Sequence, residues 1–124
     1  MEEIRLYGTT NGSGALTVNG EKAVEGYLYA VEWIDGTFSN GVGAVISFQN
    51  RGSGVAITAL TLTAANDDDW YFPRELVHDA SGNALIGTAG GDRCMPLVTG
   101  TPRMVVSSGG ASKDGGCILY IKEF

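Results

Sequence analysis

The spacing of the glycines is the sequence feature that most restricts the secondary structure and fold open to this chain. There are 19 glycines among 124 residues, and in the first half they stand at positions 8, 12, 14, 20, 26, 36, 41, 43, 52 and 54. Glycine destabilises a helix interior, and an ordinary helix needs about ten uninterrupted residues, so nearly every helical window in this half is broken. Only 3 prolines are present, which argues against a disordered chain. We therefore expect turns and short strands.

Alternation of apolar residues with other residues predicts several strands. Segment 42–48 has an apolar residue at every second position, namely Val42, Ala44, Ile46 and Phe48. Segment 117–122 alternates in the same way, beginning with Cys117. Alternate side chains of a strand share one face, so each segment is expected to bury one face. Segments 4–7 and 103–107 complete the predicted set.

Segment 24–34 is predicted to be a central strand, because both of its faces are largely apolar and it is rich in aromatic and β-branched residues. The residues expected to share one face are Tyr27, Tyr29, Val31 and Trp33.

Segment 55–63 also alternates, but its apolar residues change from one face of the strand to the other partway along. Val55 and Ile57 would lie on one face, whereas Leu60 and Leu62 belong to the other. An extra residue in one strand of a pair produces such a slip. A β-bulge or a bend between sheets is therefore predicted near Ala59.

Glycine-containing turn signals separate these segments. They are Asn11-Gly12, Asn19-Gly20, Asp35-Gly36, Asn40-Gly41, Ser81-Gly82-Asn83, Gly90-Gly91-Asp92, Gly109-Gly110 and Asp114-Gly115-Gly116. Short strands with turns at this spacing are typical of an all-β fold. We expect one domain over residues 1–124, an antiparallel β-sandwich that is jelly-roll-like, with short hairpins and little or no helix.

Three connecting segments carry specific expectations. Residues 1–20 form either an arm that orders only on a partner or the first hairpin, with 11–14 as its turn. Residues 107–113 are predicted to be a hairpin loop between the strands 103–107 and 117–122. Segment 72–79 is expected to be extended, with one helical turn as the alternative.

Charge and cysteine content exclude several function classes. The formal net charge is −6, so a nucleic-acid backbone would be repelled over most of the surface. No apolar run approaches the ~18 residues of a membrane helix, and the acidic N-terminus is unlike a secretory signal. Cys94 and Cys117 are too few for a zinc cluster and are expected to be reduced, unless paired strands bring them together. We expect synthesis in the cytoplasm and no nucleic acid, membrane or cofactor as partner.

Two polar constellations are weak candidates for chemistry. His78 is followed by Asp79 and Ser81, but catalytic triads converge in space, and adjacency in sequence does not create their geometry. Residues 66–69 contain three successive carboxylates, but the segment lacks the glycine and the glutamate of an EF-hand loop. We therefore expect a solvated acidic loop, no metal site and no enzyme activity.

The run Trp70-Tyr71-Phe72-Pro73-Arg74 supports two interpretations. Tryptophan, tyrosine and arginine are enriched at binding hot spots, because they offer rigid contact area with a polar end. Alternatively, Trp70 and Phe72 pack in the core. In a binding surface, Tyr71 and Arg74 would point outward while their neighbours point inward. The candidate partner-binding residues are Trp70, Tyr71, Arg74 and Asp68.

About the C-terminal half of the chain carries a general pattern. Its parts are residues 66–74, Val77-His78-Asp79, Met95-Pro96-Leu97-Val98 and residues 103–120. This pattern resembles small virion structural proteins of tailed bacteriophages. The resemblance implies a capsid-decorating or cement protein, or a head–tail accessory, that is made in the host cytoplasm and resides in the virion. Its implied partners are the major capsid protein or another virion protein, and further copies of itself, with a trimer favoured.

A second class of function stays open. A carbohydrate- or receptor-binding module of the phage particle would use an exposed Trp70 or Trp33 as a stacking platform. An enzyme, by contrast, would need His78 or the acidic run to act.

Overall fold

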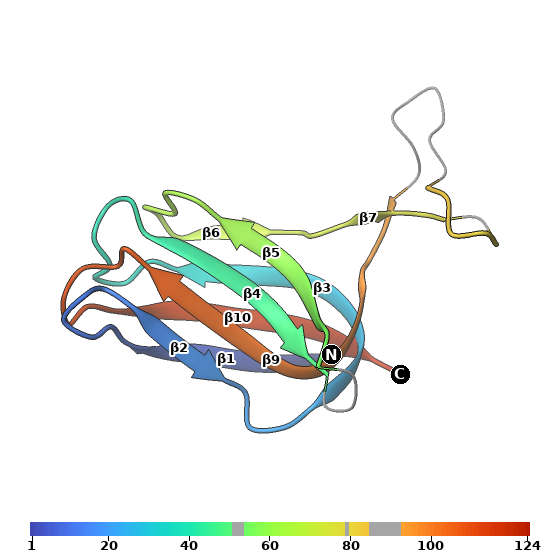
Figure 1. Cartoon of the computed structure of the whole chain (residues 1–124), viewed down its shortest axis with the longest axis horizontal. Helices are drawn as coiled ribbons and strands as arrows, with labels where there is room; N and C mark the ends of the chain where they lie inside the picture. Colours follow the sequence, from blue (N-terminus) through green and yellow to red (C-terminus); the bar gives the residue numbers. More distant parts are fainter. Residues whose placement is uncertain (51–53, 79, 85–92) are drawn as a thin grey trace.

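The computed structural model describes residues 1–50, 54–78, 80–84 and 93–124, and within them the regular structure is entirely β (Figure 1). The strands are β1 (Glu2–Thr9), β2 (Leu16–Asn19), β3 (Val24–Ile34), β4 (Gly43–Gln49), β5 (Ala56–Leu62), β6 (Asp69–Tyr71), β7 (Glu75–Leu76), β8 (Arg93–Cys94), β9 (Leu97–Ser107) and β10 (Asp114–Glu123). In this part of the chain, no helix is long and apolar enough to cross a membrane.

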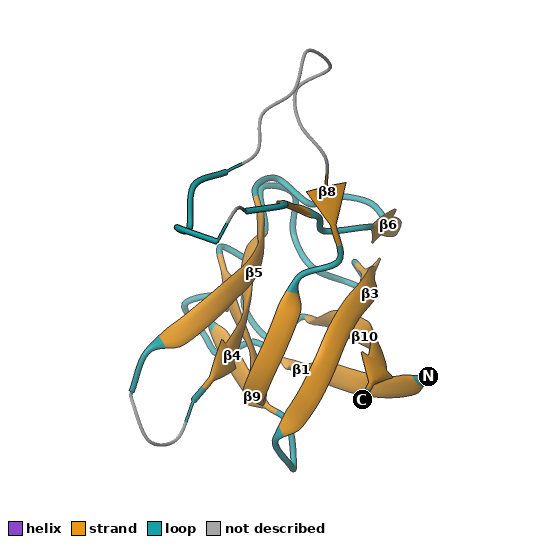
Figure 2. Ribbon diagram, turned by 90° about the vertical axis from the view of Figure 1, so that its right-hand side faces the viewer, coloured by secondary structure: helices purple, strands orange, loops and turns teal. Residues whose placement is uncertain are grey.

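The strands form two packed layers that share β9 (Figures 1 and 2). One layer contains β1, β10, β3 and β6, and the other contains β2, β9, β4 and β5. The first residues of β9 pair with β3, and its later residues pair with β2 and β4. A continuous antiparallel path therefore runs β1-β10-β3-β9-β4-β5. The predicted all-β antiparallel β-sandwich is therefore confirmed.

Gly100 allows β9 to pass from one layer to the other. Its φ is +111°, and a Cβ at this position would collide with the carbonyl oxygen of Gln49. Only glycine adopts such a backbone without strain while leaving room for the neighbouring strand. The residues before Gly100 pair with β3, and those after it pair with β4 and β2.

Two connections cross between the layers: the turn over residues 11–14, for which a hairpin was one of two alternatives, and the loop over residues 107–113, which was predicted to be a hairpin. Residues 11–14 do form a turn, with the Gly14 N–H donating to the Asn11 carbonyl over 3.1 Å. However, β1 pairs with β10 and β2 pairs with β9, so this turn joins different layers. The prediction of a hairpin loop over residues 107–113 is wrong for the same reason, because β9 and β10 do not pair. The two connections contact each other, since the Thr10 N–H donates to the Lys113 carbonyl over 2.8 Å.

The core lies between the two layers. Its largest fully buried side chains are Trp33, Phe48, Leu6, Leu28, Ile46, Met104, Leu119 and Ile121. The predicted inward faces of segments 42–48 and 117–122 are confirmed. Trp33 stacks on Phe38 with 5.7 Å between ring centroids, and its indole N–H donates to the Ala65 carbonyl over 2.9 Å. Trp33 is therefore a core residue and is not available as a stacking platform.

Two bulges set which side chains face outward. On β5, Leu60 pairs with Ile46 and Thr58 pairs with Ser47, so Ala59 is the extra residue and the predicted bulge is confirmed. On β3, Ala30 pairs with Tyr120 and Leu28 with Ile121, which leaves Tyr29 unpaired in that ladder. The prediction that all four residues Tyr27, Tyr29, Val31 and Trp33 share a face is therefore wrong. The first two are exposed and the last two are buried.

The glycines of the predicted turn Asp114-Gly115-Gly116 belong instead to β10. A Cβ at Gly116 would collide with the carbonyl oxygen of Leu6, so glycine here permits the close pairing of β1 with β10. The turn at 81–82 is present. The signal Gly90-Gly91-Asp92 lies outside the described residues.

The short strands β7 and β8 pair with each other and extend away from the sandwich (Figure 1). Residues 72–78 contain no helical turn, so this stretch is extended as expected.

Candidate interaction surface

The acidic loop 66–69 holds β6 against the rest of the sandwich. The side-chain oxygen of Asn66 accepts a hydrogen bond from the Gly41 N–H over 2.7 Å, and Asp68 Oδ1 accepts one from the Asp35 N–H over 2.8 Å. Asp68, a predicted partner-binding residue, is therefore engaged in fixing the turn after β3. Because β6 pairs with β3 through residues 69–71, this anchoring also determines where Trp70 projects.

Side chains on the outer face of the β1-β10-β3-β6 layer form a contiguous aromatic surface, which we define as Tyr29, Trp70, Phe72 and Tyr120. Trp70 lies 5.2 Å from Tyr120 and 6.5 Å from Phe72, and Phe72 lies 6.2 Å from Tyr29, measured between ring centroids. Trp70 is 48% exposed and Phe72 is 54% exposed. Large aromatic side chains normally bury such area, so this surface is suited to contact with another molecule.

The sequence-based interpretations placed Trp70 and Phe72 inward and Tyr71 outward, but the structure shows the reverse. Trp70 and Phe72 are exposed, whereas Tyr71 is half-buried and packs against the core. Burial, with a smaller contribution from the negative charge of Asp69, raises the pKa of the Tyr71 hydroxyl. Tyr71 therefore supports the surface from beneath, and Phe72 is a surface residue that the sequence-based set of candidates omitted.

Arg74 is held in place at the margin of the aromatic surface. Its guanidinium donates to the carbonyl of Tyr29 over 3.0 Å and to that of Pro73 over 2.7 Å. The guanidinium carbon also lies 5.7 Å from the centroid of the Tyr29 ring. These contacts restrict the side chain, so Arg74 would lose little conformational entropy on meeting a partner.

Two carboxylates border Tyr120 on the same face. The Tyr120 hydroxyl donates to Glu32 Oε1 over 2.9 Å, and Glu3 stands opposite Tyr120 on β1. This hydrogen bond, followed by burial and the charges of Glu32 and Glu3, raises the pKa of Tyr120. Sequence patterning had not singled out Glu32 or Tyr120. Their strands were predicted, but the pairing that brings them beside Trp70 depends on the order of strands in the sheet.

Asp67 and Asp68 of the acidic loop act on Asp35. Burial, with the charges of Asp68 and Asp67, raises the pKa of Asp35, and its buried Oδ1 has no hydrogen-bond partner among the described residues. No group of three or more histidine, cysteine or acidic side chains with metal-binding geometry occurs in the described ranges.

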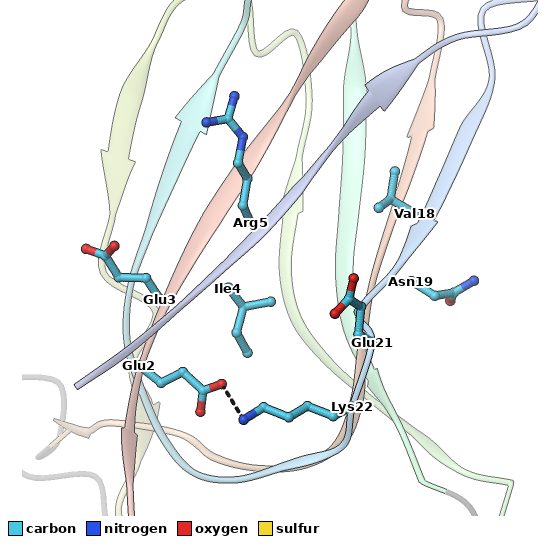
Figure 3. A pocket seen from close by; sticks show the side chains of 9 residues that line it. Glu2, Glu3, Ile4, Arg5, Val18, Asn19, Glu21 and Lys22 are labelled. Atoms are coloured by element: carbon cyan, nitrogen blue, oxygen red, sulfur yellow. Dashed lines mark ion pairs between the residues drawn. The ribbon is translucent and has the colours of Figure 1, made fainter.

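A groove opens between the edge strands β1 and β2 at the end of the sandwich where the chain begins (Figure 3). It has a volume of about 600 Å³, and Ile4 and Val18 supply its apolar lining. Lys22 Nζ lies 3.0 Å from Glu2 Oε1, while Glu2 Oε2 is buried without a hydrogen-bond partner in the described part of the chain. Farther along the two strands, the Leu16 side chain of β2 lies beside Gly8 of β1.

The remaining candidates lie on and near the β7–β8 pair. His78 is exposed and forms an isolated bridge with Ala84, while Asp79 lies outside the described residues. A second groove of about 370 Å³ is lined by Tyr27, Glu75, Cys94, Met95 and Leu97. Cys94 is exposed and Cys117 is buried in the core, and both are free thiols.

The aromatic surface combines exposed aromatic side chains with polar groups that are held in place. Comparison of the chain with protein-family models, with curated proteins and with solved structures found no match. The function is therefore inferred from the geometry of the surface itself.

Proposed function

We propose that this chain is a non-enzymatic structural protein of a tailed-phage virion, which decorates or stabilises the capsid through protein–protein contacts made by the aromatic surface. The observation that supports this proposal is the exposure of Trp70 and Phe72 beside a restrained Arg74. Aromatic and arginine side chains dominate the binding energy of protein interfaces when they are rigid and become desolvated. The rigid sheet beneath them supplies that rigidity.

The proposed partners are the major capsid protein or another virion protein, together with further copies of the chain. Homo-oligomers close by rotational symmetry, and a trimer would match a local threefold position of a capsid. Synthesis in the bacterial cytoplasm followed by residence in the virion belongs to the same proposal.

Co-sedimentation with purified expanded phage capsids tests the proposal, with light scattering to report the mass of the free protein. We expect saturable binding, weakened about tenfold or more in the double variant Trp70→Ala/Phe72→Ala, as for interface hot spots. Val45→Ala is the matched control, because Val45 is similarly apolar and exposed but lies on the outer face of the other layer. Binding that the double variant leaves unchanged would remove the aromatic surface from the proposal. A monomer that ignores capsids would remove the structural role.

One observation favours a carbohydrate-binding module as the second candidate. The rings of Trp70 and Phe72 are exposed and their planes differ by only 16°. Parallel exposed rings suit stacking on the apolar faces of sugars. Binding on a glycan array that is lost in Trp70→Ala, together with indifference to capsids, would establish this candidate over the virion protein.

A further inference from the structure

On this outer face, one cation lies over Tyr29 of the aromatic surface and another lies over Tyr7 outside it, whereas in the described part of the chain none lies over the tryptophan of the surface. The guanidinium of Arg74 lies over Tyr29, and that of Arg5 lies 4.6 Å from the centroid of the Tyr7 ring on the same outer face. Among the described residues, no cation lies over Trp70. Tryptophan is the strongest cation-binding ring of the aromatic side chains.

Two carboxylates flank the Trp70–Tyr120 pair and give this part of the surface a negative charge. Glu32 stands directly opposite Trp70 in the β3–β6 pair, and Glu3 stands opposite Tyr120. Tyr120 occupies only Oε1 of Glu32, and Glu3 is exposed and makes no ion pair within the described residues. The raised pKa of Tyr120, to which both carboxylates contribute, is consistent with this local excess of negative charge.

Within the described ranges, none of the nearby cations Arg5, Arg74 and Lys122 forms an ion pair with these carboxylates. Arg5 lies over Tyr7, and Arg74 donates to two backbone carbonyls. The one ion pair in the described part of the chain joins Lys22 to Glu2, away from Trp70. An exposed aromatic ring near two carboxylates that form no ion pair is complementary to a planar cation, which can contact the ring and donate hydrogen bonds at the same time.

We propose that the Trp70–Tyr120 part of the surface binds an arginine side chain of a partner protein, with the guanidinium against Trp70 and its N–H groups directed to Glu32 and Glu3. This inference rests on the proposed function and specifies the chemistry of the partner. Arginine fits better than lysine, because its planar group is weakly hydrated and stacks on rings, whereas an ammonium group is compact and strongly hydrated.

The test uses the full chain, labelled with ¹⁵N, and the probe N-acetyl-arginine amide at constant chloride concentration. The readout is the indole N–H signal of Trp70. Trp33 provides an internal reference, because its indole N–H is buried and bonded to Ala65. We expect the Trp70 signal to shift saturably with the arginine probe and less with N-acetyl-lysine amide. It should barely respond to N-acetyl-glutamine amide, and Trp33 should stay unmoved.

Variants separate the contribution of the carboxylates. Glu32→Gln and Glu3→Gln should each weaken binding of the probe about threefold, the size expected for an exposed ion pair. Glu25→Gln is the matched control, because Glu25 is an exposed glutamate on the same strand whose pairing partner is Thr99. It should leave the affinity unchanged. Equal responses to the arginine and glutamine probes, or an affinity that neither carboxylate variant changes, would overturn the inference.

Co-sedimentation separates this inference from the proposed function. If the arginine probe fails while capsid binding still requires Trp70, the choice of arginine is wrong and the virion role stands. If capsid binding does not require Trp70, the aromatic surface is not the docking site, and the proposed arginine contact fails together with the role proposed for that surface.

Discussion

Cys94 and Cys117 show how far surroundings change one type of side chain. Cys94 is exposed on β8, whereas Cys117 is fully buried on β10 between the two layers. Burial penalises the thiolate and raises the pKa of Cys117 to about 12. A buried thiol of this kind behaves as a small apolar residue and is protected from reagents, so its role is in packing.

The raised pKa of Cys117 predicts a loss of stability in alkaline solution. The ordinary value for the thiol is 9.0, so between about pH 9 and pH 12 the unfolded chain releases a proton that the folded chain keeps. The free energy of unfolding should therefore fall by up to about 1.4 kcal/mol for each pH unit in this window. Urea unfolding at pH 8, 9 and 10 measures the slope.

Substitutions show which of the two thiols causes the free energy of unfolding to fall with pH. Cys117→Val should remove its contribution, since valine fills similar space without titrating, whereas Cys94→Ser should retain it. Because other groups also contribute to the pH dependence in this range, the contribution of Cys117 is the difference between the slopes measured for the native protein and for Cys117→Val. Parallel pH profiles for the native protein and Cys117→Val would contradict the assignment.

At the scale of strands, alternation predicts a face only where one face is polar. Segment 55–63 alternates apolar with hydroxylated residues, so its phase slip was visible and the bulge at Ala59 could be predicted. Segment 24–34 is apolar on both faces, so the bulge at Tyr29 left no trace in the pattern. The outward position of Tyr29 in the candidate surface was therefore out of reach from sequence.

Turn signals predict where the chain reverses but not which strands become neighbours. A dipeptide such as Gly109-Gly110 indicates that the chain reverses, but it does not indicate which layer the next strand joins. Both connections at this end of the sandwich cross between layers, and the neighbours of each strand follow from that choice. The placement of Glu32 and Tyr120 beside Trp70 is a consequence of strand order. Trp70 and Arg74 were predicted as candidates from their residue types, whereas no pattern in the sequence indicates Glu32 or Tyr120.

The crossing of β9 between layers predicts a strong effect of one small substitution. In Gly100→Ala, a side chain would have to adopt a φ near +111° and would collide with the Gln49 carbonyl. We expect the free energy of unfolding to fall by about 2 kcal/mol or more, as at other strained backbone positions. Thermal and urea unfolding measure it.

Gly12→Ala is the matched control, because a Cβ there meets nothing within 4 Å and its φ is not positive. It should change the free energy of unfolding by less than about 0.5 kcal/mol. Equal effects of the two substitutions would mean that β9 does not need glycine at its crossing.

At the scale of the whole molecule, the two ends of the chain complete one layer together. β1 pairs with β10 from Glu2 opposite Ile121 to Thr9 opposite Asp114. The sandwich therefore closes only when its first and last segments meet. Such pairing between distant segments favours slow and cooperative folding. It also makes β1 an integral strand whose side chains contribute to the common core.

Leu6 tests whether β1 belongs to the folded core of the free chain. Its side chain is 1% exposed and lies in the same core as Leu119 and Trp33. Leu6→Ala should lower the free energy of unfolding by about 2–5 kcal/mol, because it removes apolar contacts and leaves a cavity. Glu3→Ala, an exposed change on the same strand, should cost less than about 0.5 kcal/mol. If both substitutions had the same small effect, residues 2–9 would be an arm that orders only on a partner. Glu3 would then reach Tyr120 only in the complex.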